Sequence, residues 1–343
     1  MANNLGSNVT RKLARVFLEK FEASRVLTKG VDTQLLSGKF NPSSGSTVDF
    51  KRPHDYNSLR TAGGDISSST KSDIIAGKAT GTVQNYFTVA TEFGNVEEAL
   101  ELDQLDMILA PMATRIVTDL ELDLGRYMAK NCNLSYGTPG TVVDAWADVA
   151  GAGSLMDSIG VPKDRTWMYA MNPFTCQNLA STQAGLGAGS NDLVDSAWKR
   201  AQVSTPFGGL QCISSNALPT RTVTTAADLA GTITGTPDVT YVTAKDTMTQ
   251  TIGVTGFTAS AVVKAGDVVE ITGRYRRSLS TREVITGADG AAIKWRGVVT
   301  ADVTLGTAGE GNLVVAGPAI YEATGQYNTA DSAIAASDVI TIL

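Results

Sequence analysis

Side chains that commonly carry catalysis or bind metal are scarce in this chain. His54 is its one histidine. The three cysteines, Cys132, Cys176 and Cys212, form no CxxC pair. Zinc sites and activated nucleophiles usually require imidazole or closely spaced thiolates. No G-x-S-x-G, H-E-x-x-H or Walker motif occurs. The sequence therefore predicts a protein that is not an enzyme and that needs no metal or cofactor.

Two further groups contain residue types that are common in binding sites, but their spacing does not fit such a site. Asp119, Glu121 and Asp123 are two residues apart in a predicted helix, which scatters them around it rather than placing them on one face. The loop GLGAGSND at 185–192 lacks the Lys-Ser/Thr of a phosphate-binding loop, and it follows helix-like sequence instead of a strand. We expect a surface loop there and no metal site.

Composition indicates a globular chain of more than one domain. Its 343 residues exceed the roughly 250–300 at which one hydrophobic core stops growing. Hydrophobic residues are 43% and charged residues 18%, with a formal net charge of −6, so any contact with nucleic acid must be local. No apolar run reaches the roughly 18 residues of a membrane span. We therefore expect no membrane partner. The odd number of cysteines fits a reduced, intracellular protein.

Residues 8–28 predict an amphipathic helix. Its apolar residues recur at helical spacing and are Leu13, Val16, Phe17 and Phe21. The basic side chains in and just after it are Arg11, Lys12, Arg15, Lys20, Arg25 and Lys29. This basic face has two interpretations, a solvated surface or an arm that grips an acidic neighbour or nucleic acid. As an arm, it would contact acidic protein, such as the acidic residues at 97–103, and would rely mainly on burial of Phe17 and Phe21.

The stretch from 39 to 93 is rich in Gly, Ser and Thr and has few large apolar residues. Alternation within Thr47–Lys51 and Thr82–Thr91 predicts the two legs of a long hairpin. Such a segment cannot hold a core alone, so its order must come from packing on something else. We expect it to lie across a neighbouring subunit, to which the KRPHD segment offers Lys51, Arg52, His54 and Asp55.

Helical spacing recurs in the next part of the chain. Residues 96–109 predict a short helix, and the pattern restarts after Pro111 to give a second helix over about 111–132, the longest periodic element. From 141 to 215 the sequence mixes helices and strands, including a strand that ends at Pro173.

After Pro219, short runs rich in Thr, Val, Ala and Gly predict a separate β-barrel or sandwich. Its basic residues are Arg274, Arg276, Arg277 and Arg282. They could bind phosphate or an acidic partner, but an exposed loop that makes ion pairs with nearby acidic residues is the expected role.

Three runs of the sequence are distinctive: VDAWADVAGAGSLMDSIGVPKDRTWMYAMNPFTCQNLA, FGGLQCISSNALPT and VVKAGDVVEITG. They resemble segments of the tailed-phage major capsid proteins of the Hong Kong 97 type, and more narrowly of the coat proteins of Salmonella short-tailed phages. The first run resembles that family's DAW helix followed by a strand ending in Asn-Pro, the second its run into an inserted domain, and the third a strand pair within that domain. The resemblance implies an α+β Hong Kong 97-like (HK-97-like) capsid fold with an inserted, telokin-like all-β barrel.

By this resemblance the chain divides into five parts: an N-terminal arm over 1–38, an E-loop over 39–95, a spine helix and peripheral domain over 96–140, a peripheral and axial α/β region over 141–218, and an inserted β-rich domain with the chain end over 219–343. The family's chain returns from the insertion to add strands to the main core, whereas this sequence stops at DVITIL. We therefore expect the core of the main domain to look incomplete.

The function that the resemblance implies is self-assembly into the hexamers and pentamers of an icosahedral head around double-stranded DNA. The implied partners are further copies of the chain, a scaffolding protein, a portal and, indirectly, the packaged DNA. The implied location is the virion, after assembly in the host cytoplasm. The alternative from another class is a phage tail-tube, decoration or adhesion-type β-rich binding protein, which would lack a long helix with an extended hairpin before it.

Overall fold

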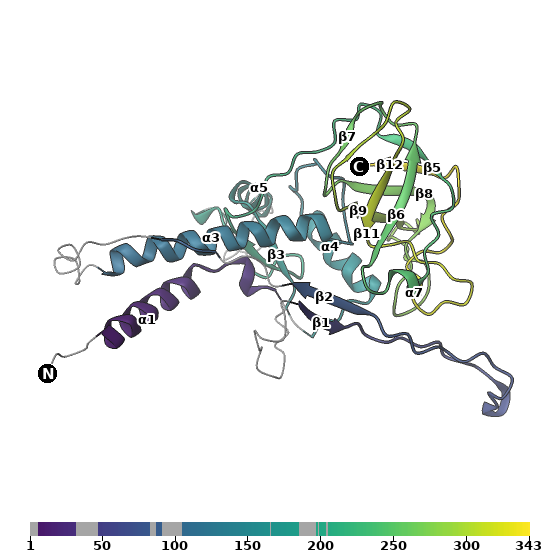
Figure 1. Ribbon diagram of the computed structural model, residues 1–343, viewed down its shortest axis with the longest axis horizontal. Helices are drawn as coiled ribbons and strands as arrows, with labels where there is room; N and C mark the ends of the chain where they lie inside the picture. Colours follow the sequence, from purple (N-terminus) through teal and green to yellow (C-terminus); the bar gives the residue numbers. More distant parts are fainter. Residues whose placement is uncertain are drawn as a thin grey trace.

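A long helical shaft, a small α/β layer, a closed β-barrel and a projecting hairpin make up the computed structural model (Figure 1). The structure describes residues 6–31, 47–82, 87–90, 105–164, 166–184, 197, 199–203 and 205–343. The predicted glycine-rich loop at 185–192 and the acidic segment at 97–103 lie outside these ranges.

The shaft pairs α1 (Gly6–Ser24) with α3 (Leu105–Asn131), and Figure 1 shows the two lying lengthwise together. At 1.5 Å per residue, the 27-residue α3 is roughly 40 Å long. Its buried positions Ala113, Val117, Glu121 and Gly125 recur every four residues and so form one stripe. The amphipathic helix and the long helix that the sequence predicts are both confirmed.

The predicted break at Pro111 is wrong, because α3 runs through it. A proline inside a helix removes the hydrogen bond to residue i−4, here Met107, and kinks the helix or ends it. Met107 and Pro111 are both exposed, so water can take the place of that bond. The first predicted helix therefore has no separate end within the described residues, and its last residues belong to α3.

The α/β layer is built on two parallel strands, β3 (Met168–Met171) and β4 (Gln211–Ser214). Two helices pack with them, α4 (Trp146–Ile159) and α5 (Pro173–Ala184). The α4 helix ends at Gly160, whose φ of 97° is the left-handed conformation that closes a helix. The core of this layer consists of Val149, Met171, Cys176, Leu179, Phe207 and Leu210. These elements match the mixed α/β region predicted from the sequence.

The closed barrel has six strands in the order β11-β6-β5-β12-β8-β9. Their bounds are β5 Ala230–Thr234, β6 Thr249–Thr255, β8 Val268–Tyr275, β9 Lys294–Val299, β11 Gly311–Ala316 and β12 Val339–Ile342. Smaller elements flank it: α7 (Tyr241–Ala244), and the pair β7 (Val262–Val263) and β10 (Val303–Thr304). The predicted β-rich module after Pro219 is confirmed as this barrel.

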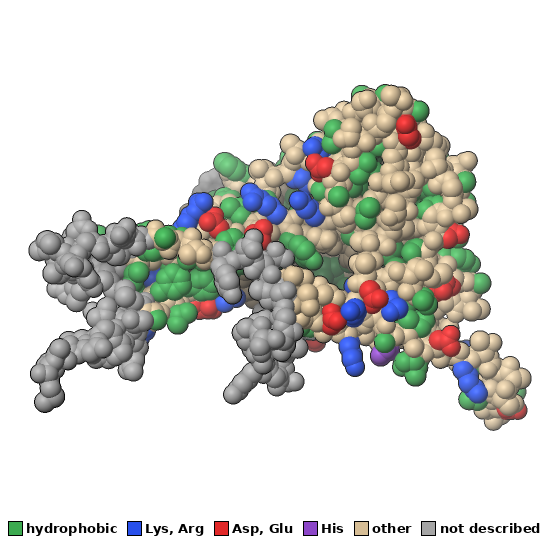
Figure 2. Space-filling view, viewed as in Figure 1, with side chains coloured by type: hydrophobic (Ala, Val, Ile, Leu, Met, Phe, Trp, Pro, Cys, Tyr) green, Lys and Arg blue, Asp and Glu red, His purple; other side chains and the backbone are tan. Residues whose placement is uncertain are grey.

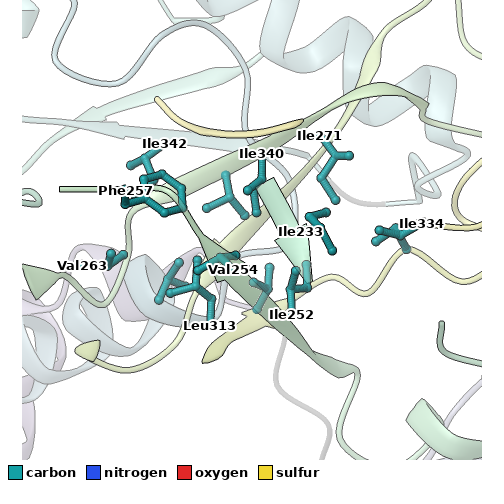
Figure 3. Packing of buried hydrophobic residues seen from close by; sticks show 14 of the residues in the cluster. Ile233, Ile252, Val254, Phe257, Val263, Ile271, Leu313, Ile334, Ile340 and Ile342 are labelled. Atoms are coloured by element: carbon teal, nitrogen blue, oxygen red, sulfur yellow. The ribbon is translucent and has the colours of Figure 1, made fainter. Parts of the chain in front are cut away.

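Alternating side chains fill the barrel. Along β6, Ile252 and Val254 point inward and are at most 1% exposed, while Thr251 and Thr255, which alternate with them, are not buried. Figure 3 shows these two side chains with Ile233, Leu313 and Ile340 converging from several strands. A dry core with strands on all sides makes the barrel a stiff body to which other segments can be fixed.

The hairpin joins β1 (Thr47–Lys51) to β2 (Lys78–Thr82), antiparallel, with Lys51 opposite Lys78. The first leg was predicted correctly, but the second leg, expected at Thr82–Thr91, is wrong. The sequence KATGT lacks apolar alternation, and cross-strand polar bonds from Lys78 and Thr80 to Asp49 accompany the pairing instead. Residues 52–77, here called the extension, run far out from the body to the short 3-10 turn η3 (Ala62–Gly64) (Figure 1).

Candidate assembly interfaces

The extension is fixed at its root by the barrel of the same chain. On the α7 side, the Arg52 guanidinium Nε donates to the Lys245 carbonyl at 2.8 Å. Lys78 N–H donates to Asp246 Oδ1 at 3.2 Å, and Lys245 Nζ donates to the Ala76 carbonyl at 3.3 Å. Both legs of the extension are therefore bonded to the end of α7.

Arg282 holds the outgoing leg a few residues further on. Its Nη2 lies 2.7 Å from Asp55 Oδ2 and 3.1 Å from the Tyr56 carbonyl, and its Nη1 donates to the side-chain oxygen of Asn57. Asn57 Nδ2 in turn donates to the Thr324 carbonyl at 2.9 Å. Figure 2 shows charged side chains of both signs gathered where the extension leaves the barrel.

Aromatic packing supports the same junction. The rings of Tyr241 and Tyr327 stack with centroids 3.7 Å apart, and Ile75 of the returning leg packs against their cluster. Tyr327 Oη accepts from Asp55 N–H at 3.1 Å. Gln326 Nε2 donates to the Asp73 carbonyl at 2.8 Å. Apolar and polar contacts thus fix the same few residues of each leg.

The extension leaves apolar side chains in solvent, Ile74 at the root and Leu59 and Ile66 beyond it. Leu59, Ile66 and Ile74 are 44%, 46% and 75% exposed. A groove of about 540 Å³ opens between residues 69–75 of the extension and residues 322–327 of the barrel. Large apolar side chains held away from their own core are typical of a surface that another molecule covers.

The N-terminal arm presents its two faces as expected. Phe17 and Phe21 are half-buried, with ring centroids 6.0 Å apart, while Arg15 is exposed. The side chain of Arg11 lies outside the described residues. After the helix, the chain is anchored to the shaft, because the buried Glu121 carboxylate accepts from Val26 N–H.

The four residues of the KRPHD segment chosen from sequence have different surroundings. Arg52 and Asp55 contact the barrel of their own chain, as described above, whereas Lys51 and His54 are exposed. Sequence reasoning did not identify Asp246, Tyr327 or the contact made by Arg282. Their partners lie far away in sequence, 227 residues in the case of Asp55 and Arg282. In the sequence, only the basic residues at 274–282 indicated that this part of the barrel binds acidic groups.

The arginines of that basic run bond to other residues of the same chain. Arg274 forms an ion pair with Asp338 at 2.6 Å, and Arg277 donates to the Arg282 carbonyl at 2.8 Å. Ion pairs are confirmed for Arg274 and Arg282, but the expected exposed loop is wrong, because all four arginines are half-buried or buried and the acidic partners lie 64 and 227 residues away in sequence. Arg276 differs, because it is only 8% exposed and donates to the carbonyls of Arg296 and Asn133 at 3.2 and 3.4 Å. Burial lowers the pKa of its guanidinium to about 10, so it still carries its charge at neutral pH.

Arg276 also joins the barrel to the end of α3, because Asn133 lies two residues after the last residue of that helix. Arg296 Nη1 donates to the Gly137 carbonyl at 2.6 Å across the same junction. At Gly317, where φ is +79°, an added Cβ would lie 2.8 Å from Asn133 Cβ, so the two backbones approach closely. Shaft, barrel and extension root are therefore connected in series.

Within the described part of the chain, no three His, Cys, Asp or Glu side chains come together as metal ligands. The thiols of Cys132, Cys176 and Cys212 are all free. Burial raises the pKa of the Cys212 thiol to about 11, which keeps it protonated and a poor nucleophile. No described helix combines the length and the apolar character needed to cross a membrane. The exposed apolar side chains of the extension are instead suited to contacts between proteins.

Comparison with known proteins agrees with these observations. The family described as P22 coat protein, gene protein 5, matches residues 1–343. A major capsid protein from Acyrthosiphon pisum secondary endosymbiont phage 1 is 38% identical over 348 residues, an alignment that covers 100% of this chain and 81% of that protein. Shaft, hairpin and barrel all lie within both matches. The chain therefore belongs to the P22 coat-protein family of phages, and its role is structural, as a subunit that forms a capsid.

Proposed function

We propose that this coat protein self-assembles into the hexamers and pentamers of an icosahedral, Hong Kong 97-like (HK-97-like) head that encloses double-stranded DNA. The observation that carries the proposal is the extension, which the subunit holds out rigidly at its root with uncovered Leu59, Ile66 and Ile74. A projecting segment of this kind is stable when a neighbouring subunit covers it.

The proposed parts follow the chain. Residues 1–38 form the arm, 39–95 the E-loop, 96–140 the spine helix and peripheral domain, 141–218 the peripheral and axial region, and 219–343 the inserted β-domain with the chain end. The described elements α1, the hairpin, α3 and the barrel fall in this order, which supports the division. Arm residues Phe17 and Phe21 and the extension would supply the intersubunit contacts.

The proposed partners are further copies of the chain, a scaffolding protein and a portal, with the packaged DNA as an indirect neighbour. Assembly takes place in the host cytoplasm, and the protein has no enzymatic activity. The 27-residue α3 and the match over the whole chain count against a tail-tube, decoration or adhesion-type protein.

Electron microscopy of the expressed chain, alone and with a scaffolding protein, tests the proposal. Closed shells of uniform diameter are expected. A protein that remains monomeric at high concentration in both preparations would contradict the proposed function.

A further inference from the structure

The contacts that fix the root of the extension to the barrel, here called the clasp, have two halves. In the first, Arg282 of the barrel bonds residues 55–57 of the outgoing leg. In the second, Lys245 and Asp246 bond both legs. Arg282 has a φ of 64°, a conformation that residues other than glycine seldom adopt. Its carbonyl accepts from Arg277, and its guanidinium donates to three successive residues, 55–57. An unusual backbone conformation persists when its surroundings hold it, and it often marks a functional position.

The second half leaves no room for the returning leg to shift inward. A Cβ at Gly77 would lie 2.9 Å from both the Lys245 carbonyl oxygen and the Tyr241 hydroxyl. The backbone of this leg is therefore seated directly on the barrel. Because Arg282 and Lys245 hold the outgoing leg at two separate places and residues 245–246 also hold the returning leg, the hairpin can neither swing nor twist about a single point.

The direction of the extension matters because it is a long lever. On the returning leg, the eight residues 65–72 separate the turn from Asp73 at the root, which at about 3.3 Å each places the tip at most roughly 25 Å away. A rotation of about 10° at the root would then move the tip by up to roughly 4 Å, which is as large as a van der Waals contact distance. A small change in the clasp would therefore displace the tip from its partner.

We propose that Arg282 is a positioning residue for assembly. By fixing Asp55, Tyr56 and Asn57 to the barrel, it sets the angle at which the extension reaches a second copy of this chain, and thereby the curvature of the shell. This inference rests on the proposed function for the identity of the partner, while the clasp itself is a feature of the free subunit.

The test compares Arg282→Ala with Lys264→Ala. Lys264 is a matched control because it forms an ion pair of similar length and exposure with Asp302, within the barrel and away from the extension. Hydrogen exchange in free subunits should rise at least tenfold at 52–57 and 73–78 in Arg282→Ala, with β6 and β11 unchanged. Assembly should then give open sheets or shells of mixed diameter. Lys264→Ala should match the wild type in both measurements.

Exchanging the charges of Arg282 and Asp55 distinguishes a role in positioning the extension from a general loss of subunit stability. Arg282→Asp alone should fail as Arg282→Ala does, and adding Asp55→Arg should restore shells of uniform diameter in part. If Arg282→Ala unfolds the barrel, Gly77→Ala is the second variant, because its added Cβ would push the returning leg away from Lys245 and Tyr241 without changing the barrel core. It should give the same faster exchange and the same irregular shells. Unchanged exchange, uniform shells from Arg282→Ala, or no rescue by the exchange would overturn the inference. Wild-type subunits that never form shells would instead refute the proposed function and, with it, the role in assembly.

Discussion

Glu270 is the residue whose surroundings give the barrel a defined pH response. Its side chain, 10% exposed, accepts from Lys294 Nζ at 2.6 Å and from Arg296 Nε at 3.0 Å. Burial alone would raise the pKa of this carboxyl, but the two cationic donors outweigh it and lower the pKa below the usual value. A carboxyl with a lowered pKa stabilises the fold above the pKa of the unfolded chain, and that contribution is lost as the pH falls through the folded value.

Wild-type stability should therefore fall as the pH drops below about 4.5, and Glu270→Gln should flatten this dependence. Chemical unfolding followed between pH 3 and 8 measures it. At pH 7 the variant should be less stable, because Lys294 and Arg296 lose their anion. Stability curves that stay parallel down to pH 3 would show that Glu270 does not carry the response.

Leu313 tests the barrel core. It is fully buried among side chains from several strands, so Leu313→Ala leaves a cavity and should reduce the free energy of unfolding by about 2–5 kcal/mol. Val242→Ala is the control, since Val242 is 53% exposed and its truncation should change stability by less than about 0.5 kcal/mol. Equal losses in the two variants, measured by denaturant unfolding, would contradict the assigned core.

At the scale of elements, α1 should act through its apolar face. Phe17 is half-buried and stacks near Phe21, whereas Arg15 is exposed. Exposed ion pairs contribute only about 0.2–1 kcal/mol each, less than the burial of an aromatic ring. Phe17→Ala should therefore impair assembly more than Arg15→Ala, and assembly should depend weakly on salt.

Light scattering during assembly, at low and at moderate ionic strength, measures both effects. Loss of assembly in Arg15→Ala with normal assembly in Phe17→Ala would show that the arm acts by electrostatics instead.

Element types with a strong periodic pattern could be predicted from the sequence. The barrel was predictable because its strands alternate inward and outward residues, as β6 does. Helix α3 was predictable except at Pro111, where the helix continues through the proline. Strand β2 was not predictable because KATGT has no apolar face, and its position follows from pairing with β1.

The clasp could not be predicted for a different reason. Arg282 and Asp55 are 227 residues apart, and nothing local in either segment identifies the other as its partner. The sequence did indicate that residues 39–93 need an external support. The structure adds that the barrel of the same chain supports the root, which leaves the tip for a neighbour.

At the scale of the whole molecule, the accessibility of the extension should change on assembly. Trypsin has Arg60 and Lys71 beyond the root, both exposed in the subunit. Cleavage there should be fast in free subunits and slow in shells, because a neighbour covers the tip. Mass spectrometry of timed digests measures the two rates, and the exposed Lys163 serves as an internal reference site. Equal protection factors at all three sites would argue against packing of the extension between subunits.

A reconstruction of the assembled shell at a resolution that traces residues 47–82 tests the central claim most directly. The account predicts a closed shell of hexamers and pentamers in which each root stays on its own barrel, with Arg282 at Asp55, while Leu59 and Ile66 contact an adjacent subunit. A shell in which the tip folds back onto its own subunit, or in which the root has left the barrel, would contradict it.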